Sequence, residues 1–384
     1  MGEWLEKRMD EIADFNPRES IQKGATAKKI AMDKLQPFCR DVPGYEMEAF
    51  SGGTKFRNGD TIMARITPCL ENGKTAKVDV LDEEEVGFGS TEYIVFRAKE
   101  GNDPDFIYYL VTSPVVREPA IKSMVGSSGR QRVQTDVVQG LKVRVPDLEG
   151  QQAIASVLKV LDDKIAANRK VNENLLQQAQ VLYKDRFVDL NPFDGEIPMD
   201  WHLGTVSEII ELHDSKRIPL SSRERANLAK IYPYYGATSV MDYVDRYLFD
   251  GIYLLLAEDG TVVDSKGFPI LQYVEGKFWV NNHAHIITGK NGFTVETLYL
   301  LFSLTNVQSI VTGAVQLKIS QANLNKVSVV IPSEAELSAF NSIVQPIFAQ
   351  IRNLRAENDR LVATRDTLLP RLMSGELDVS SIDF

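Results

Sequence analysis

Two long heptad patterns constrain the fold of this chain more than any other feature. In each pattern the seam residues recur in alternating steps of four and three over four heptads, which is the spacing of a coiled coil. The first seam consists of Ile154, Leu158, Leu161, Ile165, Asn168, Asn172, Leu175, Ala179 and Leu182, and the second of Phe340, Val344, Ile347, Ile351, Leu354, Asn358, Leu361, Arg365 and Leu368. Because polar residues occupy matching places, we expect the two helices to pair with each other and Asn172 to face Asn358. Two separate homodimers are the alternative. The alternative for the two asparagines is a frayed and wetter part of the seam.

The sequence around these helices is also repeated. Val143–Pro146 reappears as Val329–Pro332, and the same shift of 186 residues continues along both helices. Further upstream, Tyr93–Val95 resembles His285–Ile287 at a shift of 192. Each half of the chain is therefore a globular domain followed by a helix. We place the first domain at 1–147, the first helix at 148–190, the second domain at 191–332, and the second helix with a C-terminal tail at 333–384.

The globular halves combine short β-type runs with helical stretches. Lys142–Val145 and Ile252–Leu256 are rich in branched residues and are bounded by residues that favour turns. Helical patterns lie near Phe106–Thr112 and Thr297–Leu304. The sequence therefore predicts an α+β protein. Two mixed α/β domains in a pseudo-twofold arrangement would be separated by a long antiparallel two-helix coiled coil.

Composition and charge restrict the function. The 384-residue chain has two cysteines, which cannot build a disulfide framework, so we expect a cytoplasmic protein. No run approaches the roughly 18 apolar residues of a membrane span. The net charge is −10, and the four parts defined above carry −3, 0, −4 and −3. Since no part is basic, DNA binding would depend on local cationic patches or on a partner.

Two glycine-containing segments, Met124–Arg132 and Val311–Lys318, are candidates for such patches, and each lies shortly before a strand that ends in proline. Backbone N–H groups in loops of this kind bind phosphates, and Arg and Gln side chains reach base edges. A third segment, 216–230, has a local charge of +4. Solvated loops are the alternative for all three. The candidate DNA contacts are Gly126, Ser128, Arg130, Gln131, Arg132, Lys216, Arg217, Arg223, Arg225, Tyr235, Gly313, Gln316 and Lys318.

Signatures of catalysis are weak. Asp264, Glu275 and Lys277 fit a loose pattern of metal-dependent nucleases. The same segment also fits a β-hairpin in which Glu275-Gly276-Lys277 forms the turn. His283 and His285 alternate along a strand, but a metal site would need two further ligands. We therefore predict no catalytic residue, no metal site and no cofactor in this chain.

The chain resembles the specificity subunits of type I restriction–modification systems over essentially its whole length. The resemblance rests on the ending Leu368–Leu377, on Val143–Ile165, and on the openings around Trp4 and Trp201. It implies two target-recognition domains that each read one half of a bipartite site in double-stranded DNA. It also implies that the helices dock two methyltransferase subunits.

The resemblance further implies that nuclease and translocase subunits join through the complex. S-adenosylmethionine, ATP and magnesium would then be bound by the partner subunits, and this chain would be non-catalytic, with no membrane partner. Three alternatives are the specificity subunit of a type IIB restriction enzyme, a metal-dependent nuclease that uses Asp264, Glu275 and Lys277, and a pure assembly scaffold.

Overall fold

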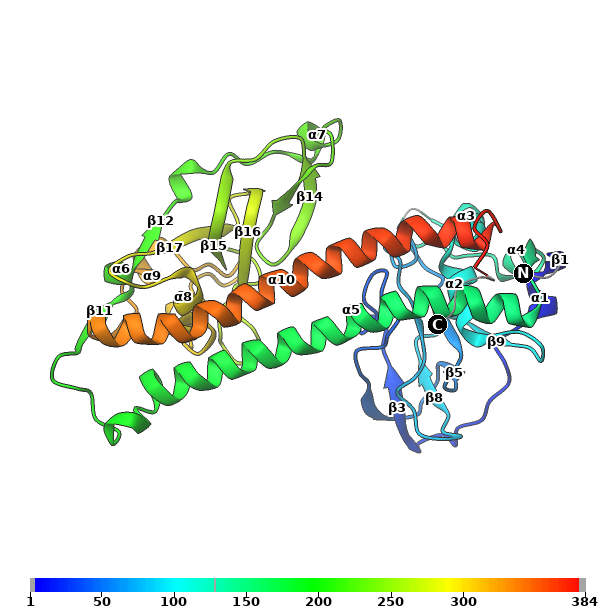
Figure 1. The fold of residues 1–384 in the computed structure, drawn as a ribbon, viewed down its shortest axis with the longest axis horizontal. Helices are drawn as coiled ribbons and strands as arrows, with labels where there is room; N and C mark the ends of the chain where they lie inside the picture. The colour runs from blue at the N-terminus through cyan, green and yellow to red at the C-terminus, as the bar shows by residue number, and fades with distance from the viewer. Residues whose placement is uncertain (1–3, 128, 380–384) are drawn as a thin grey trace. The chain divides into compact units, whose positions relative to one another are not determined.

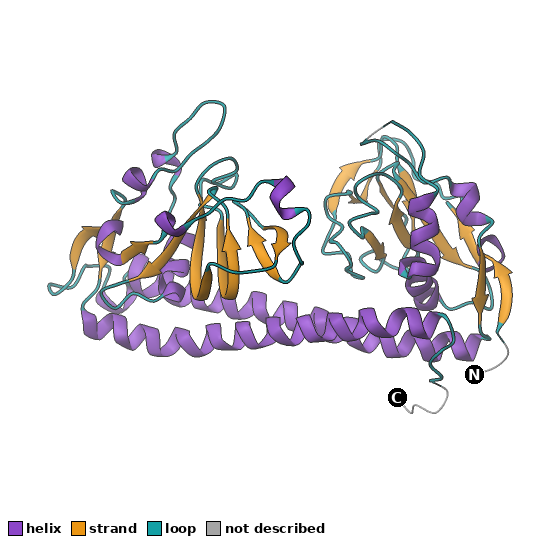
Figure 2. Ribbon diagram, turned by 90° about the horizontal axis from the view of Figure 1, so that it is seen from above, coloured by secondary structure: helices purple, strands orange, loops and turns teal. Residues whose placement is uncertain are grey.

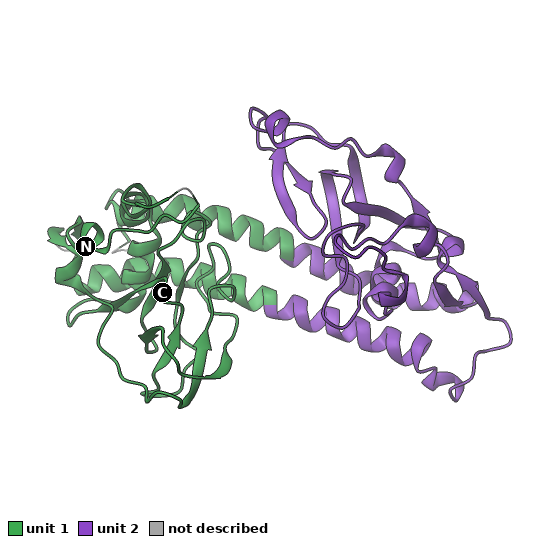
Figure 3. Cartoon of the chain, turned by 180° about the vertical axis from the view of Figure 1, so that it is seen from behind, with its two compact units in different colours: residues 1–169, 355–384 green, residues 170–354 purple. Residues whose placement is uncertain are grey.

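The computed structural model describes residues 4–127 and 129–379 of the chain. The chain divides into two compact units, one made of residues 1–169 with 355–384 and the other of residues 170–354 (Figure 3). Each unit contains one mixed α/β domain and a part of both long helices. The first unit thus combines two distant stretches of sequence, because the end of the second helix packs in it.

The two heptad patterns form two long helices. The first pattern lies on α5 (Leu148–Tyr183), which continues into a π-helical turn over Lys184–Val188. The second lies on α10 (Glu334–Met373), which is a continuous helix although it contains Pro346. Within each unit the two helices lie side by side and run in opposite directions (Figures 1 and 2). The expected antiparallel helix pair is therefore present.

Most seam residues are buried, but the buried stripe drifts along each helix. Ile154, Leu158 and Ile165 are buried in the first unit, as are Phe340, Val344 and Ile351 in the second. Leu182, however, is 40% exposed, and the neighbouring Tyr183 is buried in its place. On α10, Phe348 is buried more deeply than Ile347. A straight helix drifts by about 20° per heptad against an ideal seven-residue repeat, so the buried position moves to the next residue after several heptads.

A polar pair lies inside the helix pairing of the first unit. The amide nitrogen of Asn168 donates to the amide oxygen of Asn358 at 3.0 Å and to Glu357 at 2.9 Å. Asn358 was expected to face Asn172, so its partner lies one turn earlier. Asn168 is buried and Asn358 is half-buried, and such an amide pair favours one register of two helices, because any other register leaves the amides unpaired.

The domain of the first unit contains two four-stranded sheets, ordered β2-β9-β6-β7 and β4-β3-β8-β5, and a two-stranded ribbon of β1 and β10. Figure 1 labels many of its elements. The strands are β1 (Leu5–Arg8), β2 (Ala13–Phe15), β3 (Thr26–Ile30), β4 (Glu46–Ala49), β5 (Thr54–Phe56), β6 (Thr61–Ala64), β7 (Thr75–Lys77), β8 (Gly87–Gly89), β9 (Tyr93–Ala98) and β10 (Lys142–Val145). The short helices are α1 (Met9–Ile12), α2 (Pro104–Thr112), α3 (Pro114–Lys122) and α4 (Thr135–Gln139).

The domain of the second unit contains one six-stranded sheet, ordered β12-β17-β15-β16-β13-β14, and a ribbon of β11 and β18. Its strands are β11 (His202–Thr205), β12 (Ile210–Leu212), β13 (Tyr232–Tyr235), β14 (Val240–Val244), β15 (Phe249–Ala257), β16 (Leu271–Val280), β17 (Ala284–Gly289) and β18 (Ser328–Ile331). Its α-helices are α6 (Val206–Ile209), α7 (Ser222–Arg225), α8 (Val295–Ser303) and α9 (Gln321–Leu324), and 3₁₀ turns cover Asn191–Phe193, Asp214–Lys216 and Gln308–Ile310.

Strand pairing makes the internal repeat explicit. β2-β9-β6 in the first domain corresponds to β12-β17-β15 in the second. Phe15 pairs with Phe96, and its counterpart Leu212 pairs with Ile287. This register relates β9 to β17 by a shift of 191 residues, one less than the sequence comparison indicated. Ile94, and not Tyr93, is therefore the counterpart of His285.

The hairpin expected around Gly276 does not form. β16 runs without a break from Leu271 to Val280 and pairs with β15 along its length. Gly276 lies opposite Gly251, and both have positive φ, at +79° and +138°. Glycine adopts these angles without strain, so the two strands bend together at this point instead of reversing.

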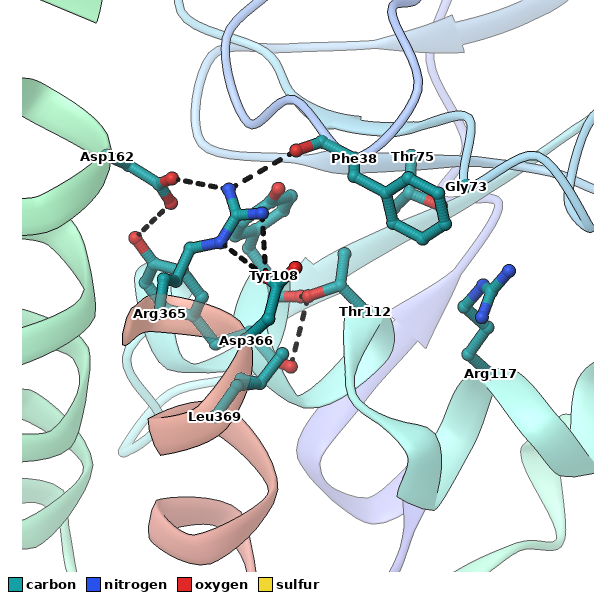
Figure 4. Close-up of a pocket in the computed structure, with 11 residues that line it drawn as sticks. Phe38, Gly73, Thr75, Tyr108, Thr112, Arg117, Asp162, Arg365, Asp366 and Leu369 are labelled. Atoms are coloured by element: carbon teal, nitrogen blue, oxygen red, sulfur yellow. Dashed lines mark hydrogen bonds and ion pairs between the residues drawn. The ribbon is translucent and has the colours of Figure 1, made fainter. Parts of the chain in front are cut away.

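A buried ionic cluster fixes the first domain on its helix segments (Figure 4). Arg365 of α10 donates to Asp162 of α5 at 2.8 Å and to the carbonyl oxygen of Phe38 at 3.2 Å. The hydroxyl of Tyr109, on α2, donates to the other oxygen of Asp162 at 2.8 Å. Arg40 reaches Asp163 of α5 at 2.7 Å. One arginine thus links the two helices to each other and to the domain.

The second domain is fixed in the same manner by a different set of residues. Glu296 of α8 is buried and accepts from the Tyr273 hydroxyl at 2.7 Å. It also accepts from two residues of α10, Gln345 at 2.7 Å and Arg352 at 3.1 Å. The carboxylate therefore joins the sheet, α8 and the long helix within this unit.

We predict that Arg365→Met destabilises the protein strongly. The substitution keeps the volume of the side chain but leaves Asp162, which is 4% exposed, as a buried charge without its cation. We expect the free energy of unfolding to fall by roughly 3–5 kcal/mol in urea denaturation. The control is Arg371→Met, which removes an exposed pair with Glu376 and should cost about 1 kcal/mol or less. Equal losses in the two variants would contradict a central role for Arg365.

Candidate nucleic-acid interface

The first glycine-containing segment forms a short hairpin in the first domain. Backbone hydrogen bonds of 3.0 and 2.9 Å join Val125 and Arg132 in both directions. Gly126 has a φ of +137°, and a Cβ atom there would lie 2.8 Å from the carbonyl oxygen of Arg130. The hairpin therefore requires glycine at this place. Its base is attached to the domain, because Val133 donates to the carbonyl of Arg65 at 2.8 Å.

The cations of this hairpin differ in their surroundings. Arg132, at the base, forms a bidentate ion pair with Glu92 at 2.6–3.0 Å, and this pair lowers the pKa of the Glu92 carboxyl. Arg130 lies nearer the tip, is exposed, and has no side-chain partner in the described part of the chain. Gln131 is half-buried. The expected contact Ser128 lies outside the described residues.

The second glycine-containing segment forms the equivalent hairpin in the second domain. Thr312 and Lys318 exchange backbone hydrogen bonds of 2.9 and 2.7 Å. Gly313 has a φ of +93°, and a Cβ atom there would lie 2.1 Å from the carbonyl of Gln316. Gln316 and Val315 are exposed at the tip. Ile319 donates to the carbonyl of Glu258, as Val133 does to that of Arg65.

A buried ionic cluster supports this second hairpin. His285 is fully buried, and its Nδ1 lies 2.6 Å from Asp214 while its Nε2 lies 2.8 Å from the carbonyl oxygen of Ile319. Because Ile319 follows the hairpin directly, the imidazole fixes the end of the hairpin. Glu258 binds two cations, Arg217 at 2.5 Å and Lys318 at 3.1 Å. Lys318, like Arg132, is therefore tied to an acid at the base of its hairpin.

The two carboxylates of the cluster remain ionised although they are largely buried. Burial alone would raise the pKa of Asp214, but hydrogen bonds from His285, the Ile286 N–H and Gln321 lower it below its ordinary value. Burial likewise opposes ionisation of Glu258, and Arg217, His285 and Lys318 lower its pKa. Each carboxylate thus faces donors supplied by the protein itself.

Asp214, Glu258 and His285 could together supply ligands to a divalent cation, because their ligand atoms lie within 4.8 Å of one another. In this structure the protein's own cations occupy the surroundings of the two carboxylates. Arg217 and Lys318 both bind Glu258, and Arg217 also approaches Asp214 to 3.4 Å. An added divalent cation would have to displace them, so we interpret the cluster as structural.

The cationic segment 216–230 separates into exposed and buried side chains. Lys216 and Arg223 are exposed. Arg225 is 7% exposed, and its guanidinium binds Asp242 at 2.8 Å and lies over the ring of Tyr234. This guanidinium therefore has its partners inside the domain. Arg217 binds Glu258 in the ionic cluster described above. Tyr235 is half-buried against Phe278. The sequence analysis predicted all of these residues as DNA contacts, whereas the structure places some of them at the surface and others in the interior.

The three residues of the nuclease pattern have separate partners. Asp264 accepts from the backbone N–H groups of Lys266 and Phe268 in its own turn. Glu275 lies 3.4 Å from Arg352, and the ammonium of Lys277 lies over the ring of Tyr247. Each side chain thus has a local structural role.

Sequence reasoning missed Glu92 and Glu258, which bind the hairpin bases, and Asp214, which binds the His285 beneath the second hairpin. They lie far from the hairpins in the sequence, at separations of 40 residues for Glu92 and Arg132 and 107 for Asp214 and Gln321. No local pattern marks them. The one available signal was His285, which the alternation of His283 and His285 placed on a strand.

The chain is thus built of two domains of one design, and each domain carries an exposed glycine-bearing hairpin. A family model described as the type I restriction modification DNA specificity domain matches residues 1–177 and 198–361. The chain therefore belongs to the specificity subunits of type I restriction–modification systems, which recognise DNA sequence. Among the described residues, no helix is long and apolar enough to cross a membrane.

Individual relatives agree with this assignment. The chain is 26% identical to the type I restriction enzyme MjaIX specificity subunit of Methanocaldococcus jannaschii, over 74% of this chain and 71% of that protein. It is 23% identical to the HindI specificity subunit of Haemophilus influenzae, over 88% and 89%. The crystal structure of the type I S subunit from M. genitalium has the same fold, with a TM-score of 0.51 and 16% identity over 96% of both chains. These similarities favour the type I assignment over the type IIB and nuclease alternatives.

We predict that the stability contributed by Asp214 depends on pH in a defined direction. Its pKa is lowered in the folded protein, so its contribution is present above its ordinary pKa near 4 and is lost as the pH falls through the lowered value. Asp214→Asn should therefore lower the free energy of unfolding by roughly 3 kcal/mol at pH 7, and by less as the pH falls below about 4.

The measurement is urea denaturation of both proteins between pH 7 and pH 3. The matched control is Asp245→Asn, because Asp245 is an exposed acid near Arg246 in the same domain. A loss for Asp214→Asn that stays constant over this pH range would show that the ionised carboxylate is not the source of the stability.

Proposed function

We propose that each domain reads one half of a bipartite site in double-stranded DNA through its hairpin. The observation that carries this proposal is that the same hairpin occurs once in each domain, at equivalent places in the strand order. In both hairpins the last cation binds an acid at the base, through Arg132 with Glu92 and Lys318 with Glu258. This arrangement leaves the tips exposed for a ligand.

The tips carry side chains suited to base edges. Arg130 is exposed at the first tip, and Gln316 at the second. Arginine donates two hydrogen bonds to guanine in the major groove, and glutamine pairs in a similar manner with adenine. Because the tips have different side chains, the two half-sites should differ in sequence.

The acidity of the chain indicates that it acts within a complex. A net charge of −10 opposes the approach of DNA phosphates, which supply much of the affinity of DNA-binding proteins. We therefore propose that two methyltransferase subunits bind the helices and contribute cationic surface. The outward side of α5 offers apolar side chains for such contacts, because Val160, Val171 and Val181 are all more than 40% exposed.

The chemistry would reside in those partners. We propose that the partner subunits bind S-adenosylmethionine, ATP and magnesium, that nuclease and translocase subunits join through the complex, and that this chain is a non-catalytic cytoplasmic subunit. The separate partners of Asp264, Glu275 and Lys277 support this division of labour. Magnesium-dependent cleavage of DNA by the purified chain would contradict it.

We predict that the two tips can be altered independently. Arg130→Ala should impair recognition of one half-site, and Gln316→Ala should impair recognition of the other, because each tip belongs to a separate domain. If Arg130 contacts a guanine, its loss should cost roughly 1–3 kcal/mol at that half-site. The measurement is sequencing that maps methylated bases in DNA modified by the complete complex.

Lys142→Ala is the matched control for Arg130, because Lys142 is an exposed cation of the first domain that lies outside the hairpin and pairs with Glu6. A mapped site that is continuous, or a change of both half-sites by one variant, would contradict reading by two separate domains.

We also predict that the isolated chain binds duplex DNA weakly and that added methyltransferase subunit raises the affinity sharply. Fluorescence anisotropy with a labelled duplex containing the mapped site tests this directly. Nanomolar, sequence-specific binding by the chain alone at physiological salt would contradict the proposed dependence on partners.

A further inference from the structure

A cationic cleft lies beside the hairpin in the first domain. It has a volume of about 500 Å³, and its lining includes Arg18, Lys55, Arg65 and Tyr93. Arg65 connects it to the hairpin, because its guanidinium donates to the carbonyl oxygen of Val133 at 3.2 Å. Thr91, which also lines the cleft, precedes the Glu92 that binds Arg132.

Two polar groups of this lining are buried without a partner. The hydroxyl of Tyr93, a residue only 2% exposed, makes no hydrogen bond within the described part of the chain, and neither does the Nε of Arg65. Buried polar groups in proteins nearly always have a partner, since a missing hydrogen bond costs free energy. Both atoms are covered by the lining in this structure, so an acceptor that reaches them from the cleft must displace the side chains above them.

The charge of the lining indicates what that acceptor is. Arg18 and Lys55 have no ion-pair partner among the described residues; Arg18 is exposed, and the ammonium of Lys55 lies over the ring of Phe50. The one acid of the lining, Glu19, is already neutralised by Arg57 and Arg97, both at 2.7 Å. The cleft therefore presents donors and positive charge, which suit an oxygen-rich anion.

The equivalent place in the second domain is already filled by the protein. Val133 donates to the carbonyl of Arg65, and Ile319 donates to that of Glu258, so Glu258 is the counterpart of Arg65. There the Glu258 carboxylate binds Arg217 and Lys318. Where the second domain places its own anion, the first domain places a cation and leaves donors unpaired.

We propose that this cleft of the first domain binds a phosphate group of the DNA backbone beside the half-site that the hairpin reads. The proposal rests on the proposed function, because it assumes that DNA lies against this hairpin. The phosphate oxygens accept from Arg18, Lys55, Arg65 and Tyr93. The contact adds affinity without adding sequence preference, and the second domain has no equivalent.

The test uses the complete complex, a duplex containing the mapped site and an unrelated duplex. Arg18→Ala should weaken binding to both duplexes by a similar factor, about tenfold, and should reduce the slope of log affinity against log salt by about one. Lys23→Ala, at an exposed lysine of the same domain, is the matched control and should leave both quantities unchanged. Wild-type affinity and slope in Arg18→Ala would overturn the proposal.

Tyr93→Phe gives a second readout that a merely structural role would not produce. The hydroxyl has no partner in the free protein, so removing it should leave the melting temperature of the full chain unchanged or raise it, while DNA affinity falls. A fall in melting temperature with unchanged DNA affinity would show that the hydroxyl serves the fold, and would overturn its role at the site.

Two further outcomes separate the sources of failure. If the wild-type complex shows no sequence preference, the proposed function fails, whatever the variants do. If it reads a bipartite site while Arg18→Ala and Tyr93→Phe bind as wild type, only the phosphate site fails. Inorganic phosphate serves as the second probe. If, at constant ionic strength, it stabilises the full chain but not Arg18→Ala, and DNA binding is unaffected, the cleft binds a free anion and the DNA assignment is overturned.

Discussion

The packing of α5 against α10 is the interaction on which both domains depend. In each unit the core is continuous with the helices: Ile154, Leu158 and Leu372 belong to the core of the first domain, and Tyr183, Phe340 and Val344 to that of the second. Each domain therefore buries its apolar residues against two helix segments that lie far apart in the sequence. Loss of the helix pairing would expose core residues of both domains, so the pairing and the domains should be stable or unstable together.

Buried ion pairs restrict the position of each domain on its helix segments more than apolar packing does. Hydrophobic contacts alone tolerate small shifts of a domain along a helix, whereas Arg365 with Asp162, and Arg352 with Glu296, satisfy each other in one arrangement only. The cost of leaving a buried charge unpaired is several kcal/mol, which is large compared with the usual net stability of a domain. These pairs therefore hold each recognition domain in a fixed orientation on its own helix segments.

The two hairpins are the proposed recognition surface of an acidic chain. Acids at the hairpin bases neutralise Arg132 and Lys318, and the glycines at 126 and 313 allow backbone turns that no larger residue could occupy. Arg130 and Lys216, by contrast, are exposed and form no ion pair within the described part of the chain. Under the proposed function, specific contacts come from a small number of side chains, and other subunits supply the bulk electrostatic attraction.

The sequence by itself determined the two heptad helices, the repeat of a domain and a helix, and the places of both glycine-containing segments, because each depends on local periodicity or on glycine and proline. It also pointed to the family. Only the tertiary structure decided which partner faces Asn358, that β16 bends at Gly276 without reversing, and that Arg225 is buried while Arg130 is exposed. The structure alone also brought Asp214, Glu258 and His285 together. These features depend on contacts between residues far apart in the chain. A local sequence pattern does not specify which distant side chain will pair with a buried charge or pack into a given space.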